Sequence, residues 1–198
     1  MGSGDGLRLT SGMPAAGADF TLMCWINFDD LLAGTTPNVF YMGPDSYGSG
    51  YVFFGMFTAG ELYLEASGPV TDTGTTLTTA TWYHLALSNE GTASSGTRLR
   101  GYLNAVLDVS VAAELGGTVT NWSIGAVPTV DSEPIAGHVA AIKRFNSVLT
   151  AEQIAQEMQV IHPVNSGCEG WYPTWPGATE RARDYSGLGR SFTEIGTL

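Results

Sequence analysis

The sequence predicts an all-β fold in which two antiparallel sheets stack face to face, with one short helix near residues 150–159. Three observations predict it. Apolar residues alternate with polar ones over many short runs, turn-forming clusters separate these runs, and only one segment has helical spacing. The chain of 198 residues is 43% hydrophobic, which is near the average of globular proteins, and only 14% charged. We expect a single domain over residues 1–198, because no linker or compositional break divides the chain.

The clearest strand covers residues 20–28, where every second residue from Phe20 to Phe28 is apolar and would lie on one side of an extended chain. Similar runs predict strands over residues 38–43, 51–57, 61–66, 83–88, 98–104, 106–111, 122–125 and 138–145. Clusters rich in Gly, Ser, Thr, Asp and Pro at residues 43–50, 71–74 and 91–96 predict the turns between them. Many short strands joined by polar turns are typical of two packed antiparallel sheets.

Residues 150–158 predict the helix. Thr150 and Gln153 have the spacing of a capping box, and Leu149 can pack on Ile154 across the first turn. An amphipathic helix on the sandwich would bury its apolar side and expose its polar side. We expect the buried residues to be Ile154, Ala155 and Met158, and the solvent-facing ones to be Glu152, Gln156 and Glu157.

Charge and composition exclude several classes of partner and cofactor. Nineteen acidic residues against eight basic ones give a net charge of -11, which would repel nucleic acid. No apolar run is long enough to span a membrane. Two cysteines and three histidines at unrelated spacings do not make a zinc site. Cys24 lies in an apolar run, which favours a buried free thiol over a bridge to Cys168.

Five segments, in order along the chain, resemble the laminin-G-like branch of the concanavalin A-like lectin and glucanase superfamily. They cover residues 19–26, 81–87, 98–107, 122–125 followed by 135–145, and 149–154. The tail at residues 170–190 resembles the return segment that often closes such domains. The resemblance implies a jelly-roll sandwich. Ala105 stands where the family hairpin usually has glycine, so we expect the turn at Asn104 and Ala105 to depart from the Asn-Gly type.

The enzymes of the superfamily that this chain resembles carry two glutamates that flank an aspartate along one strand. Here Glu61 and Glu65 have that spacing and would share one face, but Tyr63 replaces the aspartate. A retaining glycosidase needs its two carboxyl groups about 5 Å apart. We therefore expect no catalytic residues, and keep a β-glucanase-like hydrolase that uses Glu61 and Glu65 as the alternative.

Sugar binding needs flat aromatic faces together with amide or carboxylate groups for the hydroxyls. Four aromatic residues lie in or beside polar loops and are the predicted ligand contacts: Tyr41, Tyr47, Tyr51 and Trp175. The other tryptophans lie in strand segments and are expected in the core: Trp25, Trp82, Trp122 and Trp171. The loop at residues 38–51 is the preferred binding rim.

Many laminin-G-like domains bind calcium at a rim of the sandwich, and the resemblance makes this cation the one cofactor to consider. Asp131 and Glu133, in the loop after residue 125, are the candidate ligands for a calcium-dependent lectin. We expect a solvated acidic loop there and no bound metal, and keep calcium ligation by these two residues as the alternative.

We expect a non-catalytic binding or structural module displayed on an outer surface. The start of the chain has no basic segment and no apolar run of the kind that a secretory signal requires, which favours release by lysis. A decoration or fibre protein of a virus or phage particle fits these features, with surface glycans or other structural subunits as partners. Apolar residues of the strand at 51–57, taken as a solvent-facing edge, predict an oligomeric assembly.

Overall fold

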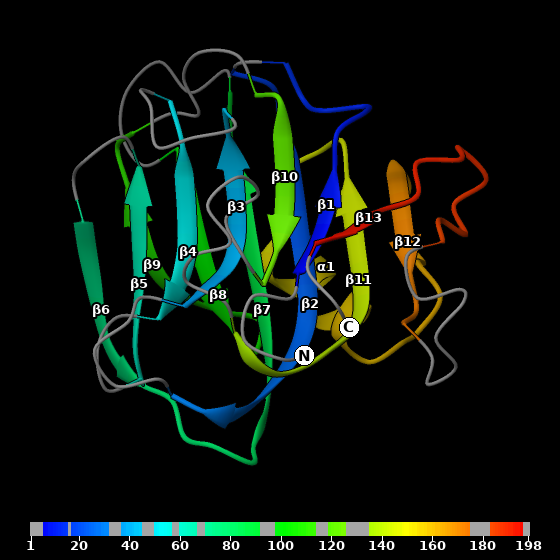
Figure 1. Cartoon of the computed structure of the whole chain (residues 1–198). Coiled ribbons are helices and arrows are strands. Elements are labelled where there is room, and N and C mark those ends of the chain that lie inside the picture. The colour runs from blue at the N-terminus through cyan, green and yellow to red at the C-terminus, as the bar shows by residue number, and fades with distance from the viewer. Residues whose placement is uncertain are drawn as a thin grey trace.

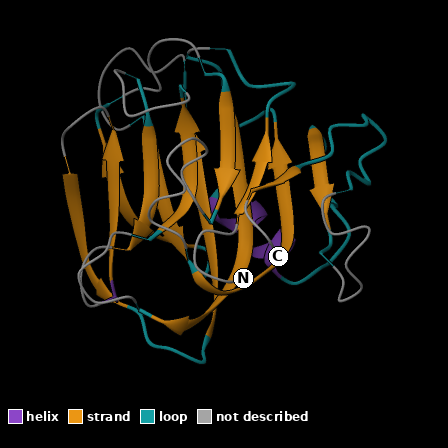
Figure 2. Ribbon diagram, in the orientation of Figure 1, coloured by secondary structure: helices purple, strands orange, loops and turns teal. Residues whose placement is uncertain are grey.

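The structure is a computed structural model that describes residues 6–15, 17–31, 37–44, 50–56, 60–66, 70–91, 98–113, 119–125, 135–174 and 183–195. These parts form two stacked antiparallel sheets and one short helix, which confirms the predicted all-β jelly-roll sandwich (Figures 1 and 2). In the described part of the chain, no helix is long and apolar enough to cross a membrane.

The first sheet has seven strands and the second has six. The seven-stranded sheet runs in the order β13 (Thr193–Ile195), β1 (Gly6–Leu9), β10 (Asn121–Ile124), β3 (Asn38–Gly43), β4 (Val52–Met56), β5 (Glu61–Ala66) and β6 (Val70–Thr76). The six-stranded sheet runs in the order β12 (Cys168–Tyr172), β11 (Ala136–Phe145), β2 (Phe20–Asp30), β7 (Trp82–Asn89), β8 (Leu99–Leu103) and β9 (Val106–Val111).

The core lies between the sheets and is built by the predicted alternation. Leu22, Cys24 and Ile26 of β2 point into it and are fully buried, as are Phe40 and Phe54 from the opposite sheet. Cys168 instead packs in a second apolar cluster, which covers the outer face of the six-stranded sheet. The two thiols therefore lie on opposite faces and both are free, as predicted for Cys24.

The helix α1 (Ala151–Met158) covers the outer face of the six-stranded sheet. Its capping box is present: the Thr150 hydroxyl accepts a hydrogen bond from the Gln153 backbone, and the Gln153 side chain accepts one from the Thr150 backbone. Leu149 and Ile154 both pack in the cluster beneath it. Glu157, predicted to face water, is instead buried, because its carboxylate pairs with the buried Lys143 of β11.

Three local predictions were wrong. Residues 71–74 form part of strand β6 and are not a turn. The strand β4, taken for an exposed edge, lies between β3 and β5 and is buried, so it gives no support to assembly through this strand. Asn104 and Ala105 both have positive φ, at 51° and 65°, as the turn of an Asn-Gly hairpin requires, so alanine has not changed this feature of the turn.

Candidate functional site

The predicted rim and the predicted glutamates come together on the outer face of the seven-stranded sheet. Tyr41, Phe53 and Tyr63 form an apolar cluster there, with Tyr51 packed against it. Tyr51 donates its hydroxyl hydrogen to the carboxylate of Glu65. Tyr41 is fully buried, so its ring offers no free face to a sugar, whereas Tyr51 is partly exposed.

Glu61 and Glu65 lie on this same face of β5, as expected from their spacing. Tyr63 stands between them, is buried, and donates to Asn38 Oδ1 over 3.5 Å. A tyrosine ring thus occupies the place between the two glutamates where the glucanase pattern has an aspartate. This arrangement does not favour the carboxyl pair of a retaining glycosidase.

Four predicted site residues lie outside the described residues: Tyr47, Trp175, Asp131 and Glu133. The sugar contacts expected of the first two and the calcium site expected of the last two therefore stay predictions. Within the described ranges, no group of three or more His, Cys, Asp and Glu side chains could hold a metal ion.

The tryptophans differ from the prediction that all four lie in the core. Trp122 is fully buried between the sheets, as predicted. Trp25 and Trp171 are only partly buried. Trp82 is 47% exposed, because it begins β7 and its side chain lies on the outer face of the sheet. The alternation of β7 could have indicated this, since Leu85 and Leu87 take the inward positions.

A pocket that the sequence did not predict lies at one end of the sandwich. It has a volume of about 330 Å³ and opens between the segment that joins β1 to β2, the end of β11, and β12. Met13, Pro14 and Phe20 give it apolar surface. Its polar wall consists of Asp19, Arg144, Asn146, Glu169 and Arg190. We call it the Arg144 pocket.

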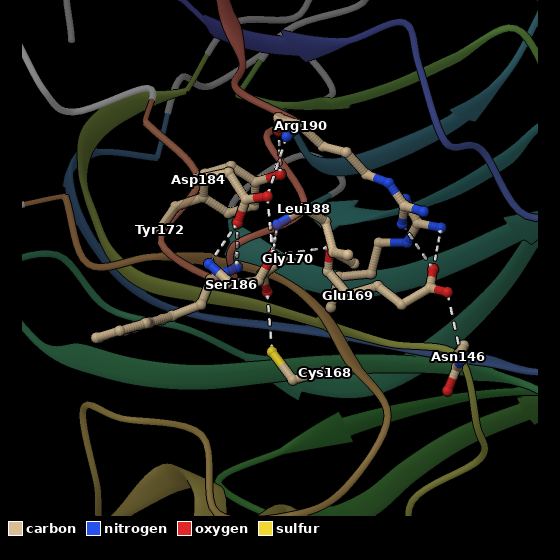
Figure 3. A network of polar contacts seen from close by, with 11 residues as sticks. Asn146, Cys168, Glu169, Gly170, Tyr172, Asp184, Ser186, Leu188 and Arg190 are labelled. Atoms are coloured by element: carbon tan, nitrogen blue, oxygen red, sulfur yellow. Dashed lines mark hydrogen bonds and ion pairs between the residues drawn. The ribbon is translucent and has the colours of Figure 1, made fainter.

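The polar wall is held together by one carboxylate (Figure 3). Glu169 Oε2 accepts from Arg144 Nη2 at 2.8 Å and from Arg190 Nη1 at 3.0 Å. Its other oxygen, Oε1, accepts from Asn146 Nδ2 at 3.2 Å. Glu169 thus fixes two guanidinium groups and an amide that come from two separate segments of the chain.

The tail of the chain positions Arg190. Asp184 accepts from the backbone N–H groups of Arg190, Ser186 and Trp171, and also from the Ser186 hydroxyl. Burial alone would raise the pKa of the Asp184 carboxyl, but these hydrogen bonds lower it below its usual value. Across the pocket, a Cβ at Gly12 would come within 2.5 Å of Arg190 Nε, so the absence of a side chain at Gly12 leaves room for Arg190.

Arg144 is the most unusual residue of the pocket. Its parity on β11 points it to the inner side of the sheet, opposite Leu22, and it is only 3% exposed. Burial lowers the pKa of its guanidinium, and the Glu169 carboxylate opposes that effect. Its Nε and Nη1 atoms are buried and have no hydrogen-bond partner in the part of the chain that the structure describes. Buried donors of this kind usually have a partner.

The Arg144 pocket combines hydrogen-bond donors, acceptors and apolar surface within the volume of a small-molecule site. Two positive and two negative side chains line it, so it carries no net charge. Such a wall suits a ligand that has many hydroxyl groups. The sequence offered a faint signal, because Arg144 lies in one of the family-like segments, but only folding brings it to Glu169 and Arg190.

The comparisons with known proteins agree with this fold. Among solved structures, a candidate carbohydrate binding protein from Bacteroides ovatus has a TM-score of 0.70 at 18% identity, and the match covers 98% of this chain. The chain spans only 58% of the length of that protein. A search of curated proteins found no significant match.

Two further structures are similar over most of the chain. Domain 4 of AbnA, a GH43 extracellular arabinanase from Geobacillus stearothermophilus in complex with arabinotriose, has a TM-score of 0.58 at 21% identity, with 77% of this chain and 71% of that chain covered. The CBM40 of the Ruminococcus gnavus IT-sialidase, bound to α2,3 sialyllactose, has a TM-score of 0.56 at 13% identity, with 70% and 82% covered.

These structural similarities, at 13% to 21% sequence identity, show only the fold. The family is shown by the sequence, because the Laminin_G_3 family model, described as the concanavalin A-like lectin/glucanases superfamily, matches residues 1–155. This chain therefore belongs to the concanavalin A-like lectin/glucanases superfamily.

Proposed function

We propose that this protein is a non-catalytic carbohydrate-binding module whose site is the Arg144 pocket. The observation that carries the proposal is the Arg144 guanidinium, which lines a mixed polar and apolar pocket and has two buried nitrogen atoms with no hydrogen-bond partner among the described residues. Sugar hydroxyls are acceptors as well as donors, so they can satisfy Arg144 and also bond to Asp19 or Asn146. The apolar side chains Met13, Pro14 and Phe20 suit the C–H faces of a sugar ring.

The similar structures support the same class of ligand. One is named as a candidate carbohydrate binding protein, and two are complexes with arabinotriose and with α2,3 sialyllactose. Catalysis is not part of the proposal. Glu169 already accepts from three side chains, and Asp19 accepts from the Gly91 backbone N–H at 2.8 Å. Both carboxylates thus serve to hold the pocket in shape.

The test is isothermal titration calorimetry with arabinotriose, α2,3-sialyllactose and a panel of neutral oligosaccharides. Arg190→Met removes one polar group of the wall, and Asn146→Ala removes another. Arg100→Met is the matched control. Arg100 lies on β8 and pairs with Glu90, and its side chain is 24% exposed, against 26% for Arg190.

We expect the parent protein and Arg100→Met to bind the same oligosaccharide equally. Arg190→Met and Asn146→Ala should each weaken that binding about tenfold, the loss of one good hydrogen bond to a charged or amide group. Absence of binding by the parent to every oligosaccharide would overturn the proposed function. Equal binding by all four proteins would overturn the assignment to this pocket.

The place of action is part of the same proposal. We propose that the module works outside a cell, displayed on a virus or phage particle or on another outer surface. The acidic composition, with eight basic residues among 198, is compatible with such display. Mass spectrometry of purified particles should find the protein there, and its detection only in host cytosol would contradict virion display.

A further inference from the structure

A row of exposed side chains crosses three strands on the outer face of the six-stranded sheet. His138 of β11 pairs in register with Asn27 of β2, and Asn27 pairs with Trp82 of β7. Residues paired across neighbouring strands point to the same face of a sheet. We call these three residues, together with Asp29, the Trp82 row.

The row combines one large aromatic surface with several polar groups. Trp82 is 47% exposed. The His138 side chain is 64% exposed and the Asp29 side chain 59%, with His138 Nε2 3.5 Å from Asp29 Oδ2. Asn27 is partly exposed. An indole beside an amide, an imidazole and a carboxylate can stack on a sugar ring and bond to its hydroxyls.

The fold explains why this part of the sheet is open. The helix covers Met23, Ala86 and Phe145, further along the same face. The helix ends at Met158, whose carbonyl accepts a hydrogen bond from Trp25 Nε1 at 3.3 Å. Asn27 is two residues beyond Trp25 on β2, so the row begins where the cover of the helix ends.

The row is narrow but long. Neighbouring strands lie about 4.8 Å apart, so Trp82 and His138 are separated by about 10 Å across β2. That span exceeds a single sugar ring and suits an extended chain laid across the strands. The surface carries the acidic Asp29 and belongs to a chain of net charge -11, so a neutral chain fits better than an acidic one.

We propose that the Trp82 row is a second carbohydrate-binding surface, which takes an extended neutral polysaccharide. It rests on the proposed function only in the class of ligand, since it shares no residue with the Arg144 pocket. The pocket would hold one end or branch of a glycan, and the row would hold the backbone of a chain. Two weak sites for the same polymer strengthen each other, because binding at one raises the local concentration at the other.

Native affinity electrophoresis in gels that contain β-glucan, arabinan or xylan tests this proposal. Trp82→Ala removes the indole, and Asn27→Ala removes the amide. Leu107→Ala is the matched control, because Leu107 is 50% exposed on β9 of the same sheet and is not in the row. Arg190→Met reports on the Arg144 pocket in the same gels.

We expect one of these polysaccharides to retard the parent and Leu107→Ala equally. Trp82→Ala should weaken the binding at least tenfold, as is usual for an exposed tryptophan at the centre of a contact, and Asn27→Ala should weaken it less. If Trp82→Ala is retarded as strongly as the parent, the proposed role of the Trp82 row is overturned and the proposed role of the Arg144 pocket is unaffected.

The other outcomes also decide. If Trp82→Ala loses its retardation while Arg190→Met is retarded as strongly as the parent, the result would support the row and contradict the pocket as the polysaccharide site. Absence of retardation of the parent by all three polysaccharides would overturn the row, whatever calorimetry gives for the pocket. Sedimentation velocity that shows a dimer in the parent and a monomer in Trp82→Ala would assign the row to self-association and overturn the proposal.

Discussion

The buried ion pair between Lys143 and Glu157 gives the sharpest stability prediction. Lys143 Nζ lies 2.7 Å from Glu157 Oε2, and the two side chains are 1% and 0% exposed. Lys143 also donates to the carbonyls of Glu157 and Val160. The second carboxylate oxygen accepts from the backbone N–H groups of Val164 and Asn165 and from the Asn165 side chain. The pair therefore joins β11, the helix and the loop that follows it.

Replacement of Lys143 by methionine removes the positive charge and leaves Glu157 buried without it. Removal of one partner of a buried pair costs about 3 to 5 kcal/mol. For a chain of this length, 1 kcal/mol corresponds to about 2 to 4 °C in Tm, so we expect a decrease of roughly 6 to 20 °C. Replacement of both residues by methionine should not restore the stability, because Val164 and Asn165 then lose their acceptor, at about 1 to 3 kcal/mol for each buried N–H group.

Urea unfolding and differential scanning calorimetry at pH 7 measure the effect. Arg100→Met is the control, since Arg100 and Glu90 form a partly exposed surface pair at 2.6 Å that should contribute less than about 1 kcal/mol. A Lys143→Met variant no less stable than Arg100→Met would refute the reasoning from burial.

Three further predictions concern titration, thiols and catalysis. Burial alone would raise the pKa of the Glu157 and Asp184 carboxyl groups. Hydrogen bonds from Lys143 to Glu157 and from Ser186 to Asp184 outweigh burial and lower the two pKa values below their usual 4.5 and 3.8. The stability that these two carboxylates contribute is therefore present above those values and is lost as the pH falls below them. Urea unfolding at pH 7 and pH 3 should show this loss, and Asp184→Asn should reduce it. Burial raises the pKa of the Cys24 thiol far above its ordinary value and that of Cys168 to about 11, so a thiol reagent at pH 7.5 should react at a normal rate only in denaturant. The parent should release no reducing sugar from β-glucan, and activity that disappears in Glu65→Gln would contradict a non-catalytic module.

The sequence was sufficient to predict the strands in which apolar and polar residues alternate strictly. Strand β2 and the capped helix follow from local patterns, because apolar spacing and cap residues act over a few residues. The edge strands β12 and β13 were not predicted as strands. They are short, and pairing with β11 and β1, far away in the sequence, holds them in place. The strand β6 was taken for a turn because Asp72 and Gly74 are turn-forming residues.

The candidate site was mostly beyond the reach of the sequence. Glu169 meets Arg144 only because β11 and β12 pair, and Arg190 arrives through the tail that Asp184 holds. Glu157 looked solvent-facing because helical periodicity cannot show that a buried lysine lies opposite. Trp82 was expected in the core because it lies in a strand segment, although it is an even number of residues from Ala86 and therefore lies on the outer face.

The most direct test of the central claim is a nitrogen-15 NMR titration that follows the arginine Nε–H and asparagine side-chain signals while an oligosaccharide found by calorimetry is added. If the Arg144 pocket binds sugar, the signals of Arg144, Arg190 and Asn146 will shift and saturate together while that of Arg100 stays in place. Saturable binding with unchanged Arg144 and Arg190 signals would contradict the account.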